Sequence, residues 1–210
     1  FNSSSDISPT AGQMPRLVGL AQASKVYRQQ EALKSNPAFE KFTNGGNEVA
    51  FGTIGDASTS EGPFWESINA AGVLQVPMVM SVWDDGYGIS VPRELQTTKG
   101  SISDALSGMQ RTADKPGYEI FVTKGWDYAH LCETYEKAVK LAREEHIPVL
   151  VHVKEVNQPQ GHSTSGSHER YKSAERLEWE TTFDCIHKFK EWILSFEAKG
   201  MAIASEEDLN

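Results

Sequence analysis

Two acidic loops have the residue types that can hold a divalent metal ion together with a diphosphate. Asp56 lies in the first loop and Asp85 in the second, and each would supply one carboxylate ligand. Mg²⁺ prefers hard oxygen ligands and readily shares phosphate oxygens, so a backbone carbonyl near Tyr87 would complete the protein's share. The N–H groups of Ala57 and Ser58 stand at a turn that enters a helix, where backbone amides favour anions. These residues predict a metal–diphosphate site.

Each acidic loop follows a short apolar run that is typical of a buried β-strand. These runs are Glu48–Ile54 and Val76–Trp83, and similar runs occur later at Tyr118–Val122 and Pro148–Val153. The carboxyl ends of parallel strands meet at one edge of a sheet, where ligands bind. Asp and Gly are also common in ordinary turns, so either loop alone is compatible with a turn that binds nothing. Their occurrence after two successive strands favours a ligand site.

Helical patterns alternate with these four runs. They cover Gln13–Ser35, Glu61–Leu74, Ser101–Met109 and Tyr128–Glu145, and an amphipathic helix is expected from Ser173 through Phe196. Strands that alternate with helices are typical of parallel sheets with right-handed crossovers. The sequence therefore predicts an α/β fold, an open and mostly parallel sheet with helices on both faces.

Several short motifs occur in a fixed order along the chain. Gly55-Asp56-Ala57 is followed about thirty residues later by Asp84-Asp85, and three longer stretches accompany them, Ser8–Pro15, Ser60–Asn69 and Tyr87–Pro92. The series resembles the alpha part of the E1 component of the 2-oxo acid dehydrogenases, a family that includes the pyruvate and branched-chain 2-oxo acid enzymes. The resemblance runs from the first residues to about Tyr171 and implies a thiamine diphosphate-binding fold.

The resemblance also implies the cofactors, thiamine diphosphate and Mg²⁺. It assigns the metal to the carboxylates of Asp56 and Asp85 and to the carbonyl of Tyr87. The residues that it assigns to the cofactor are Gly55, Asp56, Ala57, Ser58, Tyr87 and Ile89.

The pair Asp84-Asp85 departs from the family pattern, which usually has two asparagines at these positions. A carboxylate in place of a neutral amide adds negative charge beside the diphosphate, which costs on the order of 1 kcal/mol or more, depending on the effective dielectric constant. Metal binding would tighten and cofactor binding would weaken.

The stretch Gly161–Ser165 resembles the active-site loop of the family, in which a histidine faces the thiazolium ring and stabilises charge on the substrate-derived intermediate. The resemblance implies that His162 is catalytic, a role that suits a side chain whose ordinary pKa is near neutrality. A solvated histidine in a flexible Ser/Gly loop is the alternative. His168 would line the entrance of the site.

The expected organisation is a cofactor-binding domain core at 1–172, with the active-site loop at 158–170, and a C-terminal helical extension at 173–210. The chain starts without Met and closes on what looks like the start of another acidic helix, so a piece of a longer chain is expected. No segment resembles the half of the family's site that holds the activating glutamate and the aminopyrimidine pocket. The isolated chain is therefore expected to be inactive, or nearly so.

The function implied by the resemblance is oxidative decarboxylation of a 2-oxo acid, with acyl transfer to the lipoyl group of E2. Its partners would be an E1 beta-type domain or subunit and the lipoyl-bearing E2, in a homo- or hetero-oligomer. A non-catalytic or regulatory domain that keeps the fold is one alternative. A nucleotide-binding oxidoreductase is another, although no G-x-G-x-x-G turn opens a helix.

Composition sets outer limits on these expectations. The 210 residues are 39% hydrophobic and 23% charged, as in an ordinary globular domain. A net charge of -9 argues against nucleic acid and anionic membranes as partners. No apolar run approaches the roughly 20 residues of a membrane span, and the two cysteines lack metal-binding spacing. A cytoplasmic protein is expected.

Overall fold

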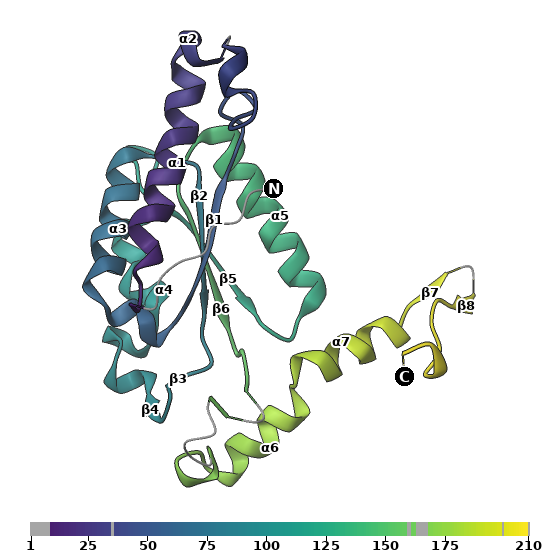
Figure 1. Cartoon of the computed structure of the whole chain (residues 1–210). Helices are drawn as coiled ribbons and strands as arrows, with labels where there is room; N and C mark the ends of the chain where they lie inside the picture. The colour runs from purple at the N-terminus through teal and green to yellow at the C-terminus, as the bar shows by residue number, and fades with distance from the viewer. Residues whose placement is uncertain (1–8, 35, 159–160, 163–167, 199, 210) are drawn as a thin grey trace.

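A computed structural model of the chain describes residues 9–34, 36–158, 161–162, 168–198 and 200–209. Its centre is a parallel sheet of β1 (Ala50–Gly55), β2 (Met78–Trp83), β5 (Glu119–Lys124) and β6 (Val149–Lys154), in the order β1-β2-β6-β5 (Figure 1). The predicted α/β fold with a mostly parallel sheet is confirmed.

The burial of the strands follows their places in the sheet. The central strands β2 and β6 are buried at all positions but their last, which explains their nearly continuous apolar sequence. In the edge strand β1, Ala50 and Ile54 are buried, whereas Phe51 is exposed. Strand β1 therefore shows the alternation of a strand that is covered mainly on one face.

Helices cover both faces of the sheet (Figure 1). On one face, α1 (Gln13–Gln29), α3 (Gly62–Leu74) and α4 (Ile102–Ala105) contribute Leu17, Ile68 and other side chains to one hydrophobic core. On the other face, α5 (Tyr128–Glu145) packs Ala138 and Ala142 against a second core. The connections from β1 to β2 and from β2 to β5 cross the sheet in one direction, over the face that α3 and α4 cover. The connection from β5 to β6 runs back in the other direction over the face that α5 covers, so all three crossovers have the same hand.

The remaining elements are short. They are α2 (Glu31–Lys34), the hairpin of β3 (Tyr87–Gly88) and β4 (Val91–Pro92), and 3₁₀ turns at Pro37–Phe39, Ala57–Ser60, Arg93–Leu95, Thr98–Gly100, Ser107–Met109, His168–Arg170 and Glu207–Leu209. The helix expected over Gln13–Ser35 is interrupted at Gln30, which is extended and separates α1 from α2.

The expectation of a single helix from Ser173 through Phe196 was wrong. The chain forms α6 (Ala174–Thr182) and α7 (Cys185–Leu194), because Asp184 caps a new helix by accepting a hydrogen bond from the N–H of His187 and the Phe183 carbonyl accepts one from Asn157. A hairpin of β7 (Glu197–Ala198) and β8 (Met201–Ala202) follows, and the stretch after it, where the start of an acidic helix was expected, forms only one 3₁₀ turn, Glu207–Leu209.

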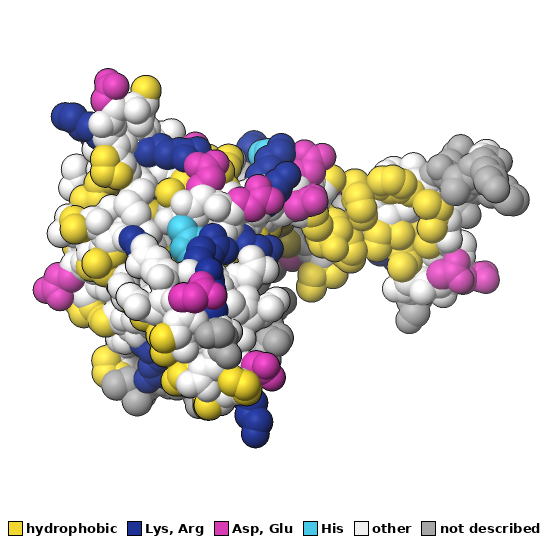
Figure 2. Space-filling model, turned by 90° about the horizontal axis from the view of Figure 1, so that it is seen from above, with side chains coloured by type: hydrophobic (Ala, Val, Ile, Leu, Met, Phe, Trp, Pro, Cys, Tyr) yellow, Lys and Arg dark blue, Asp and Glu magenta, His cyan; other side chains and the backbone are white. Residues whose placement is uncertain are grey.

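This C-terminal part extends away from the sheet, and hydrophobic side chains gather along it (Figure 2). Rings of Phe189 and Trp192 on α7 pack against Tyr128, where α5 begins, with centroids 4.3 and 5.2 Å away. Ile186 remains 80% exposed. Among the helices of the described ranges, none is long and apolar enough to cross a membrane.

Candidate cofactor site

A cavity of about 680 Å³ lies at the carboxyl ends of β1, β2 and β6. Every residue that the sequence predicted for the metal, the cofactor or catalysis contributes to its wall. His168 does not, and instead lies against Gly161. The wall is formed by Thr10, Gln13, Thr53, Ile54, Gly55, Asp56, Ala57, Ser58, Trp83, Asp85, Tyr87, Gly88, Ile89, Val156, Gln158 and His162.

The sheet itself brings the loops together, because its hydrogen-bond pattern continues beyond the strand ends. The Asp56 N–H donates to the Trp83 carbonyl at 3.0 Å, and the Asp84 N–H donates to the Val153 carbonyl at 2.9 Å. The Val156 N–H then donates back to the Asp84 carbonyl at 3.1 Å. These backbone hydrogen bonds hold the three loops side by side.

The first loop contributes Ala57 and Ser58 to the cavity wall. Ala57 and Ser58 open a 3₁₀ turn, and the first N–H groups of such a turn have no partner within it. The hairpin β3–β4 packs so closely on this turn that a Cβ atom on Gly88 would lie 2.8 Å from the Ala57 Cβ. Only glycine fits there, and it lets the two loops meet.

Asp56 is a buried carboxylate that lacks a full set of partners. It is 5% exposed, and its Oδ2 atom has no hydrogen-bond partner among the described residues. Burial, followed by the charges of Asp84 and Asp85, raises the pKa of Asp56 to about 7. A group with this environment is stabilised in its ionised form by a nearby cation.

Asp85 is the second carboxylate in the cavity wall. Its Oδ1 atom accepts a hydrogen bond from the Tyr87 N–H at 3.1 Å. Burial raises the pKa of Asp85, although that hydrogen bond and the charge of Lys172 act in the opposite direction. The surroundings of both carboxylates disfavour their ionised forms, and a bound cation would stabilise those forms.

The donor set fits a metal that shares its ligands with a second group. In the part of the chain that the structure describes, no three His, Cys, Asp or Glu side chains converge as in a closed metal centre. Two carboxylates, with the predicted backbone carbonyl of Tyr87 as a third donor, would leave coordination positions for oxygen atoms from outside the protein. This is the arrangement that Mg²⁺ adopts when it binds phosphates.

Asp84, one of the two residues that depart from the family pattern, does not line the cavity and is paired with Arg93. It is 2% exposed, and Arg93 Nη1 donates to both of its carboxylate oxygens, at 3.1 and 2.9 Å. His152 Nε2 lies 2.9 Å from Oδ2, and the other nitrogen of the His152 ring lies 2.8 Å from the Ser103 hydroxyl. Burial alone would raise the pKa of Asp84, but His152 and Arg93 together lower it. Arg93 therefore pairs with the charge of Asp84, although that charge still contributes to the raised pKa of Asp56.

His162 and Ile89 lie on the rim of the cavity. His162 is exposed, as the solvated-loop alternative also expected, but it faces the same space as Asp56 and Asp85. Ile89 is 56% exposed and has a φ of 58°, a left-handed conformation that is rare for a β-branched residue. Strain of this kind is common at ligand sites.

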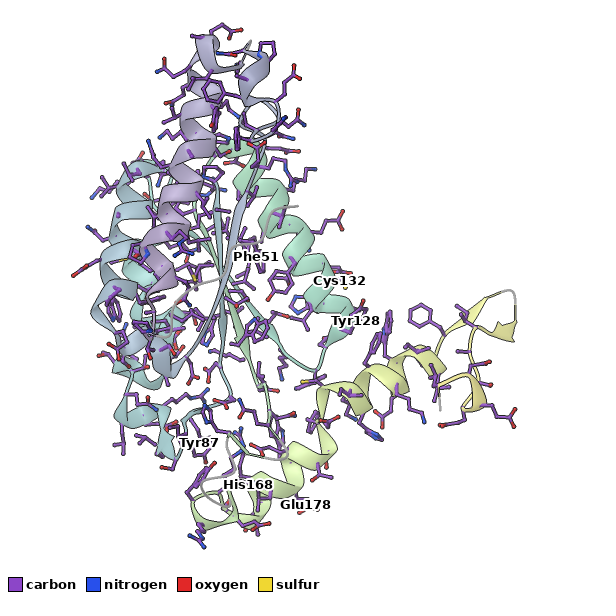
Figure 3. All side chains as sticks on the ribbon, viewed as in Figure 1. Phe51, Tyr87, Tyr128, Cys132, His168 and Glu178 are labelled. Atoms are coloured by element: carbon purple, nitrogen blue, oxygen red, sulfur yellow. The ribbon has the colours of Figure 1, made fainter. Side chains whose placement is uncertain are left out.

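The sequence did not point to the residues that support the second loop from behind. These are Arg93 and His152, described above, and Arg176, whose Nη2 donates to the Asp85 carbonyl at 2.7 Å. Figure 3 shows Tyr87 in the same lower part of the molecule as His168 and Glu178, near this support, whereas Phe51, Tyr128 and Cys132 lie higher. The four-residue spacing of Lys172, Arg176 and Glu180 was the available signal.

Comparison with known proteins places this arrangement in a family. Over residues 4–208 the chain matches the family described as "Dehydrogenase E1 component". It is 27% identical to the pyruvate dehydrogenase E1 component subunit alpha of Rickettsia bellii over 174 residues, which are 82% of this chain and 48% of that protein. It is 28% identical to the 2-oxoisovalerate dehydrogenase subunit alpha of Bacillus subtilis over 144 residues, 69% of this chain and 36% of that protein.

A solved structure supports the fold. A transketolase from Campylobacter jejuni matches 90% of this chain and 33% of its own, with a TM-score of 0.52 and 16% sequence identity. The chain spans about half, or less, of the length of the curated relatives named above. The family match nevertheless covers nearly all of it, and the chain belongs to the dehydrogenase E1 component family.

Proposed function

We propose that this chain is the diphosphate- and metal-binding module of a thiamine diphosphate-dependent 2-oxo acid dehydrogenase E1 component. The observation that carries the proposal is the buried Asp56 carboxylate, whose Oδ2 atom lacks a partner and which shares the cavity wall with Asp85. A cation between the two carboxylates would offset the burial and the neighbouring charges of Asp84 and Asp85, which raise the pKa of Asp56.

Each predicted residue has a specific task in this module. The carboxylates of Asp56 and Asp85 and the carbonyl of Tyr87 would hold Mg²⁺. The amides of Ala57 and Ser58 would donate to phosphate oxygens at the start of their turn. Gly55 contributes to the wall of the cavity at the end of β1 and would lie beside the cofactor.

The chemistry of the module depends on a bound cofactor and on the groups around it. Thiamine diphosphate supplies the carbanion chemistry that decarboxylation of a 2-oxo acid requires. Ile89 presents an apolar side chain from the rim, where it would support the organic part of the cofactor. His162 would donate a hydrogen bond to negative charge that develops near it, which an exposed imidazole can do near neutral pH.

The proposed partners follow from the family. The relatives named above are alpha subunits, so a beta-type domain or subunit would supply the rest of the active site and a lipoyl-bearing E2 would accept the acyl group. The substrate would be a 2-oxo acid. The domain boundary near 172 and a cytoplasmic location stay predictions.

Titration calorimetry of the natural full-length protein, together with its beta-type domain or subunit, tests the proposal. We expect thiamine diphosphate to bind only when Mg²⁺ is present, and NAD not to bind. The variant Asp56→Asn should abolish Mg²⁺-dependent binding of thiamine diphosphate. The control Asp104→Asn, at an exposed aspartate on α4, should bind it as the unmodified protein does. Binding without metal, or unchanged binding by Asp56→Asn, would refute the assignment, and binding of NAD alone would favour the nucleotide-binding alternative.

A further inference from the structure

The second acidic loop is held from outside the sheet by helix α6. Arg176 on this helix donates from Nη2 to the Asp85 carbonyl at 2.7 Å. Its guanidinium also lies over the ring of Tyr87, 5.5 Å from the centroid, and over the ring of Trp179 at 4.8 Å. One side chain thus contacts both the residue that offers a carboxylate to the cavity and the residue that offers a carbonyl.

A buried carboxylate fixes the orientation of Arg176. Glu180 is 1% exposed and accepts a hydrogen bond from Arg176 Nε at 2.8 Å. It also accepts two from Lys172 Nζ, at 2.7 and 2.9 Å. Two cations satisfy one buried anion, and the Lys172 ammonium lies 5.3 Å from the centroid of the Tyr87 ring. A guanidinium held in this way keeps its planar fork directed at the Asp85 carbonyl.

The same contacts join the second loop to the segment that carries His162. This segment leaves β6 at Val156, whose N–H donates to the Asp84 carbonyl at 3.1 Å, and it returns into α6. The neighbouring Asp85 carbonyl accepts from Arg176. Consecutive carbonyls of the second loop are therefore bound by the two ends of the His162 segment.

We propose that Arg176, oriented by Glu180, is a positioning residue that couples the metal-binding loop to the His162 segment. The proposal rests on the function proposed above, since it concerns the same cavity. Arg176 itself does not line the cavity, so it acts through the placement of Asp85 and Tyr87. When its contact is lost, we expect both the loop and residues 168–172, which lead into α6, to become more mobile, so that the metal ligands are no longer held in place.

The test uses the natural full-length protein, together with its beta-type domain or subunit, and the variants Arg176→Met and Arg176→Ala. The Met variant keeps the aliphatic bulk between Tyr87 and Trp179, so it carries the test if the Ala variant does not fold. The matched control is Arg143→Ala, because Arg143 Nε also donates to a backbone carbonyl, that of Asn47, at 3.2 Å but away from the cavity.

Two readouts separate this proposal from the proposed function. Calorimetry should show Mg²⁺-dependent affinity for thiamine diphosphate reduced about tenfold or more in the Arg176 variants, the effect of one lost charge-assisted hydrogen bond, and unchanged in the control. Hydrogen exchange without cofactor should be faster in peptides that contain Asp85–Gly88 and in those that contain His168–Lys172.

The outcomes are distinct. If the unmodified chain binds the cofactor and the Arg176 variants bind it equally well, the positioning role is refuted. If the unmodified protein does not bind the cofactor, the proposed function fails. Hydrogen exchange then tests by itself whether Arg176 couples the two segments. Faster exchange in only one of the two peptides, or equal exchange in variants and control, refutes the coupling.

Discussion

Removal of Arg93 should expose how the second acidic loop tolerates its additional carboxylate. In Arg93→Met, Asp84 keeps only His152 and the N–H of Gly86, which donates to Oδ1 at 2.9 Å. Breaking a buried ion pair by removing one partner costs about 3–5 kcal/mol. Arg93 is 34% exposed, whereas Asp84 is 2% exposed, so part of the guanidinium interaction is already screened. We expect a loss of about 3 kcal/mol, the lower end of that range.

The converse change should be much milder. Asp84→Asn removes the buried charge, and water can solvate the partly exposed Arg93, so we expect a cost of about 1 kcal/mol. In the double variant no unpaired charge is buried, and stability should return to within about 1 kcal/mol of Asp84→Asn alone.

Urea unfolding followed by tryptophan fluorescence measures all four members of this cycle near neutral pH. The reasoning predicts a coupling energy of about 2 kcal/mol or more between the two sites. A double variant as unstable as the sum of its parents would mean that Arg93 does not neutralise Asp84. The same conclusion would follow if Arg93→Met alone lowered the free energy of unfolding by less than about 1 kcal/mol.

Two further predictions concern residues with left-handed backbone. Ile89→Asn should stabilise the fold by about 1 kcal/mol, because Asn tolerates a φ of 58° better than a β-branched residue does. The same variant should bind thiamine diphosphate more weakly. A lower stability in thermal unfolding would contradict the strain argument. At His146, burial, then the charges of Arg28 and Lys25, lower the pKa below its ordinary value of 6.5, against the carbonyl of Gly46, which raises it. The unfolded chain then binds the proton first, so stability is lost as pH falls below about 6.5. His146→Asn, which suits the φ of 54° at this position, should lose less stability than the natural chain between about pH 7 and 5 in urea unfolding, and parallel losses would refute the assignment.

Local patterns were sufficient for most of the framework. Helix α5 has the predicted bounds, Tyr128–Glu145, because its capping Asp127 and its amphipathic sequence are both local signals. Strand β2 was evident from its continuous apolar residues, since burial on both faces leaves no alternation. The carboxyl-end rule then placed the loops of Asp56 and Asp85 together.

Features that depend on distant partners could not be predicted in this way. The carboxylate of Asp84 lies within hydrogen-bond distance of His152, 68 residues further along the chain, and that contact exists only because β6 pairs with β2. The break between α6 and α7 involves Asn157, which lies 26 residues before Phe183. A single sequence shows the periodicity of each element but not which side chain will reach it from elsewhere.

The position of β6 between β2 and β5 has a consequence for the order in which the molecule is made. Strand β6 is the last of the four sheet strands in the chain, yet it occupies an interior place in the sheet. During synthesis, β1, α3 and β2 emerge with both acidic loops well before His152 and His162. The nascent chain therefore holds its carboxylates in water until β6 inserts, and the binding site is among the last parts of the domain to form.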